Sequence, residues 1–298
     1  MSELIVSSRP ELRHPVLVAA FRGWNDGGQG ATLGAGYLAR QWGAEAFAEI
    51  DPENFYDFQA VRPNVSLEEG MTRKLEWPSN TFLHAPIPDL DRDVVIMLGV
   101  EPNLRWKTYS QLVLGLAQEL GVELVVTLGS LLADVPHTRP APVSAAASDT
   151  SLVEELGVEP SRYEGPTGIL GVLLDACRRA GIPSVSLWAA VPHYVSLAPS
   201  PRAALALCRR LGELVGTEIE LEELEQAAEE YNEQVTEAVA SDAETAAYVE
   251  ELERRVDLME AAEDLPSGES LAAELTRFLR EREENGEGSG ESAGGPAS

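Results

Sequence analysis

The sequence predicts an α/β fold with a mainly parallel central sheet and flanking helices. Short apolar runs rich in β-branched residues alternate, over residues 1–215, with longer segments whose apolar positions recur every three or four residues. This alternation is typical of βαβ units, in which a helix connects two parallel strands. The composition agrees, because 44% of the 298 residues are hydrophobic and 24% are charged, as in folded globular proteins.

The elements of this core follow one another in a regular order. Two of the apolar runs, residues 94–98 and 124–128, are almost continuously hydrophobic, so we expect them to be central strands that helices cover on both faces. The predicted strands are residues 16–20, 46–50, 94–98, 124–128 and 185–190. The predicted helices are residues 31–42, 106–120, 149–156, 167–180 and 201–215.

Residues 54–85 interrupt this rhythm and predict an inserted β-hairpin. Two extended runs, residues 73–77 and 81–84, flank the polar turn Pro78-Ser79-Asn80. The insertion is too small to bury its aromatic side chains alone, so we expect them to form an exposed surface that a homo-oligomer covers. These side chains are Tyr56, Trp77 and Phe82.

Residues 216–283 form the predicted acidic helical appendage to the 1–215 core. Apolar stripes mark one helix that includes Leu221 and Val235 and a second near residues 242–259. A third helix is expected at about 270–282, after a Pro-Ser-Gly break. Residues 284–298 lack apolar anchors and are predicted to be disordered.

The negative charge excludes several classes of partner. The formal net charge is −28, and most of the excess lies after residue 212, where 26 acidic residues face 5 arginines. A chain that repels phosphate this strongly gains no counterion-release energy on binding a polyanion. Nucleic acids and anionic membranes are therefore not expected partners.

Cysteine usage and the lengths of the apolar segments predict a cytoplasmic protein. Cys177 and Cys208, the only cysteines, lie in helical patterns and form neither a disulfide framework nor a metal motif. No segment has the apolar length of a signal peptide or a membrane span. We also expect no metal and no other cofactor.

The loop after the first strand is the first candidate site. It reads Gly23-Trp24-Asn25-Asp26-Gly27-Gly28-Gln29-Gly30 and enters a helix at the sheet edge where α/β proteins bind ligands. One interpretation is an anion or dinucleotide site. The other is that the glycines permit tight turns and close helix packing. The sequence favours the second, because a dinucleotide fingerprint starts directly after its strand and Arg22 to Asp26 intervene here.

Five residues at this sheet edge are candidates for catalysis. A histidine would carry the proton, an aspartate would orient it, and an arginine would hold an anionic group of the substrate. In the structural alternative, the same side chains only satisfy buried groups of their loops. The candidates are Asp26, Asp134, His137, Arg139 and His193.

Other residues of the same loops are candidates for ligand binding. Ser130 lies near them, but the sequence has no Gly-x-Ser-x-Gly elbow, which argues against a serine hydrolase. The ligand-binding candidates are Trp24, Asn25, Glu101, Trp106, Thr167 and Tyr194.

Six short segments occur together in this sequence. They are Gly-Trp-Asn-Asp (23–26), Arg62-Pro63, Gly-x-Glu-Pro (99–102) with Trp106, Asp-Val-Pro-His-Thr-Arg-Pro (134–140), Gly-Pro-Thr-Gly (165–168) and Val-Pro-His-Tyr (191–194). In this order and at this spacing they resemble the bacterial, mainly actinobacterial, branch of the proteasome assembly chaperone 2 family. The resemblance runs from about residue 12 to 258, and the use of 20 arginines against 2 lysines suits a high-GC genome.

This resemblance implies an α/β core like that of purine nucleoside phosphorylases and peptidyl-tRNA hydrolases, with a hairpin insertion, C-terminal helices and homo-oligomers. Among these oligomers we expect a trimer. Eukaryotic and archaeal relatives help to assemble proteasome α-rings, and some dock through a C-terminal hydrophobic-Tyr-x tail. The present sequence ends in Gly-Gly-Pro-Ala-Ser, so the acidic helices are the surface expected to reach a basic partner.

The expected function is therefore a chaperone-like or protein-interaction role with a proteasome-related partner and no assigned reaction. One alternative is a hydrolase-like or phosphorylase-like enzyme for a small molecule, with its cleft at the carboxyl edge of the sheet; another is a nucleotide-binding regulator. The loops at that edge distinguish these classes, because they either form a concave pocket or interlock through their own hydrogen bonds.

Overall fold

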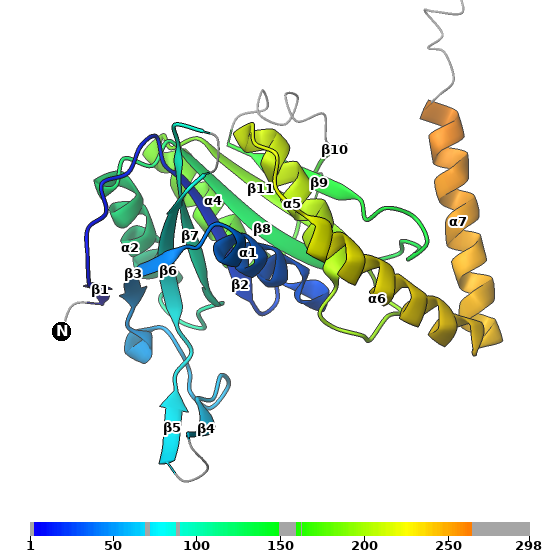
Figure 1. Cartoon of the computed structure of the whole chain (residues 1–298), viewed down its shortest axis with the longest axis horizontal. Helices are drawn as coiled ribbons and strands as arrows, with labels where there is room; N and C mark the ends of the chain where they lie inside the picture. The colour runs from blue at the N-terminus through cyan, green and yellow to red at the C-terminus, as the bar shows by residue number, and fades with distance from the viewer. Residues whose placement is uncertain (1–2, 69–71, 88–89, 149–158, 162, 264–298) are drawn as a thin grey trace, which may run out of the picture. The chain divides into compact units, whose positions relative to one another are not determined.

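The structure, a computed structural model, describes residues 3–68, 72–87, 90–148, 159–161 and 163–263 (Figure 1). The chain divides into two compact units, residues 1–249 and 250–298. The first unit contains the central sheet, its flanking helices, a separate hairpin and α6 (Glu222–Ala240). The candidate site residues therefore all belong to this unit.

The described strands of the main sheet run in the order β1-β3-β6-β7-β2-β8-β11-β9-β10. The four middle strands, β7, β2, β8 and β11, run parallel to one another. The flanking pairs β1/β3, β3/β6, β6/β7 and β11/β9 are antiparallel. The bounds are β1 Leu4–Val6, β2 Val16–Arg22, β3 Glu45–Ile50, β6 Asn80–Pro86, β7 Asp93–Val100, β8 Leu124–Ala133, β9 Val143–Ala147, β10 Glu159–Pro160 and β11 Ser184–Pro192.

The five predicted strands are confirmed, and the strands at 94–98 and 124–128 are central as expected. They form β7 and β8, which flank β2 in the middle of the sheet. Alternate residues of β2 supply the cores on the two faces: Val16 and Val18 lie in one cluster, whereas Leu17 and Phe21 lie in the other. Burial on both faces explains why these strands are continuously apolar.

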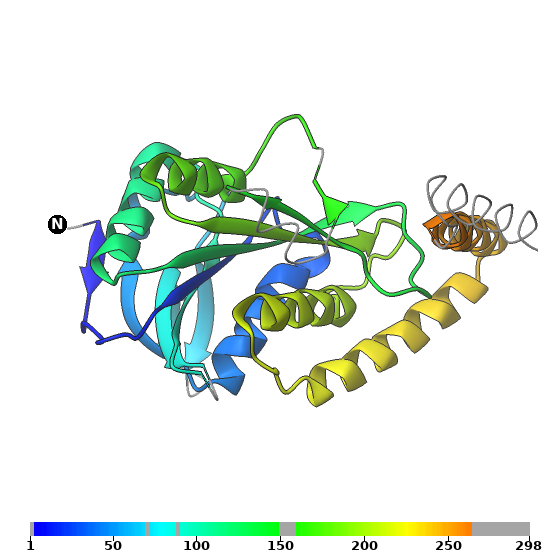
Figure 2. The ribbon, with the colours of Figure 1, turned by 90° about the horizontal axis from the view of Figure 1, so that it is seen from above.

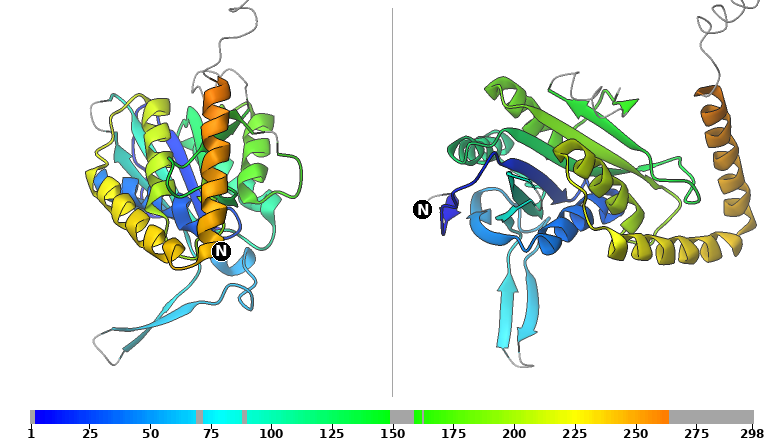
Figure 3. Two further views of the ribbon diagram at one scale, coloured as in Figure 1. Left: turned by 90° about the vertical axis from the view of Figure 1, so that its right-hand side faces the viewer. Right: turned by 45° about the horizontal axis from the view of Figure 1, so that its top comes forward.

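Helices cover both faces of the sheet (Figures 2 and 3). One face carries α1 (Gly30–Gln41) and α5 (Pro201–Val215), and the other carries α2 (Trp106–Glu119) and α4 (Ile169–Ala180). These helices confirm four of the predicted ones. The fifth, at 149–156, lies outside the described residues. Short 3-10 turns, η1 (Gly27–Gln29) and η2 (Pro52–Asn54), follow β2 and β3.

The inserted hairpin is present, but its predicted pairing is wrong. Strand β5 (Thr72–Glu76) pairs with β4 (Asn64–Glu68) in a separate two-stranded sheet. Residues 81–84 instead belong to β6, which bonds to both β3 and β7. Because β6 has a partner on each side, it is a strand of the main sheet and has no free edge for β5.

The expected exposure of the aromatic residues on the insertion is wrong for two of the three. Tyr56 and Phe82 are only 3% and 1% exposed, whereas Trp77 is 47% exposed. Phe82 is buried because it lies on β6 within the main sheet. Tyr56 also has a buried hydroxyl, which donates a hydrogen bond of 2.6 Å to the carbonyl of Val100. Only Trp77 contributes to an exposed aromatic surface.

The first of the predicted C-terminal helices is α6, which packs along α5 on the α1 face of the sheet (Figure 2). The apolar stripe predicted for it is buried at Leu224, Ala228, Tyr231 and Val235. The second predicted helix is α7 (Ala243–Glu263). The third helix at 270–282 and the tail at 284–298 lie outside the described residues. None of the helices described is both long and apolar enough to cross a membrane.

Candidate functional site

Asp26, in the loop after β2, binds the N-terminus of α1. Its Oδ1 accepts hydrogen bonds from the backbone N–H groups of Ala31 and Thr32, at 2.9 and 3.2 Å. The hydroxyl groups of Thr32 and Ser130 also donate to this carboxylate. Burial raises the pKa of Asp26, although these hydrogen bonds oppose the shift. The N–H groups that an anion would need at this helix are therefore already bound by a side chain.

The glycines of this loop have the conformational and packing role that the sequence left open. Gly28 has φ of +59°, a left-handed conformation that favours glycine. Gly30 lies against α5, where an added Cβ would come within 2.5 Å of the Cβ of Ala203. Gly34 continues the same close contact, with an added Cβ at 3.4 Å from the carbonyl of Ala204. The glycine pattern thus accounts for the approach of α1 to α5.

Glu101, which follows β7, joins three loops at the carboxyl edge of the sheet. Its Oε1 accepts from Asn25 Nδ2 at 2.7 Å and from the backbone N–H of Ile169 at 2.9 Å, and its Oε2 accepts from the backbone N–H of Trp24 at 3.2 Å. Asn25 is fully buried, and its Oδ1 has no hydrogen-bond partner within the described part of the chain. The carboxylate of Glu101 is therefore used to hold the loops together.

Trp106 also has a local role. Its indole N–H donates to the carbonyl of Pro102, and its own carbonyl accepts from the hydroxyl of Ser110 at 2.9 Å. These bonds fix the loop between β7 and the start of α2.

His137, in the loop after β8, is 2% exposed and contacts helix α6 through Thr236. The hydroxyl of Tyr194 accepts from the backbone N–H of His137 and lies 2.8 Å from its Nδ1. The Nε2 lies 3.2 Å from the hydroxyl oxygen of Thr236, which itself donates to the carbonyl of Asn232. A ring with its proton on Nε2 matches these two contacts, because Nε2 then donates to Thr236 and Nδ1 accepts from Tyr194. Both ring nitrogens are bound within the protein.

His193 and Asp134 form an exposed pair beside this cluster. The His193 Nδ1 lies 3.1 Å from the Asp134 Oδ1, and the two side chains are 44% and 70% exposed. The His193 ring contacts those of Tyr194 and Tyr248, with centroids 5.8 and 5.5 Å away. In the same region, the backbone carbonyl of Arg139 accepts from the guanidinium of Arg202.

The structure thus brings four of the predicted residues together: Asp134, His137, His193 and Tyr194. Asp26 makes its contacts with α1 and Ser130. Thr236 and Tyr248, which complete the histidine cluster, were not predicted, because nothing in the local sequence of α6 or α7 indicates a contact with loops more than fifty residues earlier. Within the described residues, no group of three or more His, Cys, Asp or Glu side chains could hold a metal ion.

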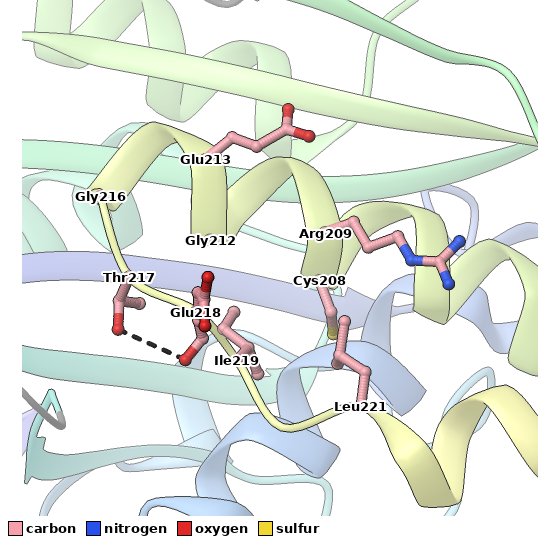
Figure 4. A pocket seen from close by; sticks show the side chains of 9 residues that line it. All are labelled: Cys208, Arg209, Gly212, Glu213, Gly216, Thr217, Glu218, Ile219 and Leu221. Carbon is pink, nitrogen blue, oxygen red and sulfur yellow. Dashed lines mark hydrogen bonds between the residues drawn. The ribbon is translucent and has the colours of Figure 1, made fainter.

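A groove beside the end of α5 has a volume of about 520 Å³ (Figure 4). Cys208, which borders it, is fully buried, and this burial raises its pKa to about 12. Arg209, on the same side, is bound to Glu225 at 2.6 Å. Cys177 on α4 is also buried, with its pKa raised to about 11. Both thiols therefore stay protonated near neutral pH and are poor nucleophiles.

Comparisons with known proteins agree on one family. The sequence profile of the PAC2 family matches residues 20–239. A crystal structure of a Mycobacterium tuberculosis proteasome-assembly chaperone homologue is 49% identical, with a TM-score of 0.73, and covers 78% of this chain and 99% of its own. A PAC2 family protein from Streptomyces avermitilis is 47% identical, with a TM-score of 0.72, and covers 79% of this chain and 99% of its own.

A more distant structure shares the fold. It is PbaB from Pyrococcus furiosus, described as an archaeal proteasome activator, which is 23% identical with a TM-score of 0.63 and covers 79% of this chain and 97% of its own. A comparison with curated proteins finds no match. The family profile spans most of the first unit, including the loops at the carboxyl edge of the sheet, and we conclude that the chain belongs to the PAC2 family.

Proposed function

We propose that this chain is a chaperone-like protein of the cytoplasm that binds a proteasome-related partner. Its membership of the PAC2 family supports the proposal, as does its 49% identity to the Mycobacterium tuberculosis proteasome-assembly chaperone homologue. The archaeal neighbours described as a proteasome activator and as a homologue of a proteasome-assembly chaperone share the fold.

The observation that carries this proposal is the interlocking of the carboxyl-edge loops. The side chains of three candidate residues form hydrogen bonds with other groups of the chain: Asp26, Glu101 and His137. An acid–base enzyme needs such groups within reach of a substrate in an open cleft. Here these three side chains fix the loops and attach α6 to the core, so none of them is placed as the acid or base of an active site.

The exposed face of α6 is the surface that we assign to the partner. Glu229, Glu233 and Glu237 lie four residues apart on this helix and are exposed, opposite its buried apolar stripe. Their spacing places them on one face. A row of like charges in a chain of net charge −28 favours a basic partner surface and steers its approach.

Capture from a cognate lysate tests this proposal. The bait chain is compared with the variant E229Q/E233Q/E237Q and with the control E45Q/E49Q/E53Q, which removes the same charge from exposed positions at β3 and η2. We expect mass spectrometry to find proteasome subunits with the wild-type chain and the control, and a several-fold smaller yield with the α6 variant. Absence of proteasome subunits from the wild-type capture would contradict the function; equal yields from all three would contradict the surface.

We also propose that the chain forms a homo-oligomer, with a trimer as the expected form. The β4–β5 hairpin supports this, because Val65, Leu67 and Leu75 are 58%, 63% and 48% exposed and share one of its faces. A two-stranded hairpin of this kind is marginally stable without a partner surface. Light scattering that returns the mass of a single chain at all concentrations would contradict the oligomer.

A further inference from the structure

A pocket of about 660 Å³ lies on the α4 face of the sheet, apart from the histidine cluster. Its walls come from the loop after β2, the end of β8, strands β9 and β11, and α4 with the residues before it. The volume is within the usual range of about 300 to 1,000 Å³ for small-molecule sites. Part of the pocket lies at the carboxyl end of β8, where open α/β sheets place ligands.

No charged side chain lines this pocket among the described residues. This is unusual in a chain with 22 basic and 50 acidic residues. A charged ligand would leave water here and find no opposite charge, at a large cost in free energy. The walls therefore favour an uncharged molecule and disfavour phosphates, nucleotides and carboxylates.

Three aromatic side chains line the pocket. Trp188 on β11 lies directly across from Gly129 on β8, and an added Cβ at Gly129 would come within 2.6 Å of the Trp188 ring. Because Gly129 has no side chain, the indole of Trp188 can pack against the backbone of β8. Trp24 and Tyr163 also line the pocket and are 62% and 65% exposed. Flat rings with this much exposed area are suited to stacking on a planar ligand.

The polar groups of the walls are hydroxyls of serine, threonine and tyrosine. The hydroxyl oxygen of Ser186 accepts from Thr127 at 2.8 Å, and its own proton is not used in that bond. Small residues such as Ala146 on β9 and Gly171 on α4 keep the space between these groups open. The hydroxyls of Ser130 and Tyr163 already donate within the chain, to Asp26 and to the carbonyl of Pro166, so toward a ligand they can only accept. Hydroxyls of this kind match the hydroxyl substituents of a neutral ring compound.

We infer that this pocket binds a neutral small molecule with a planar ring system and hydroxyl substituents. The inference does not depend on the proteasome-related role, because the pocket lies on the α4 face and the partner surface is on α6.

Two dyes with the same ring system test the inference. N-phenylnaphthylamine is neutral, and anilinonaphthalene sulfonate adds one negative charge. Fluorescence titrations of the full chain are run in about 0.5 M salt, so that the net charge of the protein is screened. We expect saturable binding of the neutral dye at one site per chain, and binding of the sulfonate that is at least about tenfold weaker because its charge has no partner in the pocket.

Three variants locate the bound dye. Trp24→Ala removes an exposed ring from the pocket, and Ala146→Phe fills its space. Trp77→Ala is the matched control, because it removes a ring of similar exposure that packs on Phe58 near the hairpin. We expect each pocket variant to weaken binding of the neutral dye by about tenfold, as loss of a stacking surface or of volume predicts, and the control to bind like the wild type.

Several results would overturn the inference. These are no saturable binding of the neutral dye, equal affinity for the two dyes, and wild-type affinity in both pocket variants. Loss of binding in Trp77→Ala alone would assign the dye to the hairpin and also contradict the pocket. Thermal melting of each variant confirms that it is folded.

Discussion

The buried imidazole of His137 joins the loop after β8 to α6, which lies about a hundred residues later in the chain. Replacing it by alanine empties the space of a buried imidazole and removes the hydrogen bonds of its ring to the hydroxyls of Tyr194 and Thr236. We expect His137→Ala to lower the free energy of unfolding by about 2–3 kcal/mol. This corresponds to a fall in melting temperature of roughly 4–12 °C in a domain of this size.

His193→Ala is the matched comparison for this prediction. His193 is nearly half exposed, and its partner Asp134 is more exposed still. An exposed pair of this kind contributes at most about 1 kcal/mol. Equal losses of melting temperature in the two variants would contradict the structural role of His137.

The two buried aspartates should respond to pH in opposite directions. Burial raises the pKa of Asp26 above 3.8. Burial also acts to raise the pKa of Asp93. Hydrogen bonds from Arg13 at 2.7 and 2.8 Å, together with the positive charge of Arg13, have the larger effect and lower the pKa of Asp93 below 3.8. Ionised Asp26 therefore costs the fold free energy, whereas ionised Asp93 stabilises it.

Urea unfolding of the wild type, Asp26→Asn and Asp93→Asn checks these signs. As the pH falls from the raised pKa of Asp26 to 3.8, the folded wild type takes up a proton and gains stability relative to Asp26→Asn. As the pH falls below 3.8 through the lowered pKa of Asp93, the wild type loses stability relative to Asp93→Asn. Slopes of the same sign for both pairs would be inconsistent with these environments.

Among the elements, the contact between α1 and α5 depends on a missing side chain. A Cβ at Gly30 would come within 2.5 Å of the Ala203 Cβ, whereas one at Gly36 in the same helix would have no heavy atom within 4 Å. We expect Gly30→Ala to destabilise the fold by about 1–3 kcal/mol through overpacking. Gly36→Ala should stabilise it by about 0.5–1 kcal/mol, because alanine is the better helix former.

Denaturant midpoints of the two variants are the measurement. An increase of both midpoints would show that helix propensity, and not the close approach of α1 and α5, decides the effect of Gly30→Ala.

The strands of the sheet show which structural features the sequence patterns can predict and which they cannot. Strands β7 and β8 were predictable as central strands because burial on both faces makes residues 94–98 and 124–128 almost continuously apolar. The partner of β5 was not, because residues 81–84 have the same local pattern whether they pair with β5 or enter the main sheet. The pairing depends on burial of Phe82 between β3 and β7, which is a non-local property.

The candidate site was predictable to a similar degree. Trp24, Glu101 and Thr167 were predicted as ligand-binding candidates because they follow strands or precede a helix at the carboxyl edge. Trp24 and Thr167 line the pocket on the α4 face, whereas Glu101 holds the loops together. Trp188 was missed, because a tryptophan within a strand is indistinguishable from a core residue. Its place in the pocket follows from the register that sets it across from Gly129, and the local sequence of neither strand shows that register.

At the scale of the whole molecule, the proposed partner surface on α6 and the proposed ligand pocket on the α4 face differ in charge. The acidic face of α6 carries part of the net charge of −28, whereas the pocket on the α4 face has no charged lining among the described residues. Binding to a basic protein should therefore weaken steeply with salt. Binding of a neutral ligand should not.

The central proposal is that the chain binds a proteasome-related partner, and light scattering on purified components tests it most directly. The full chain is mixed with purified cognate proteasome subunits, and the masses of the separated species are measured at low and high salt. We predict a species heavier than either component alone, which is depleted at high salt and by E229Q/E233Q/E237Q but not by E45Q/E49Q/E53Q. Two components that keep their separate masses at low salt, at concentrations well into the micromolar range, would contradict the claim.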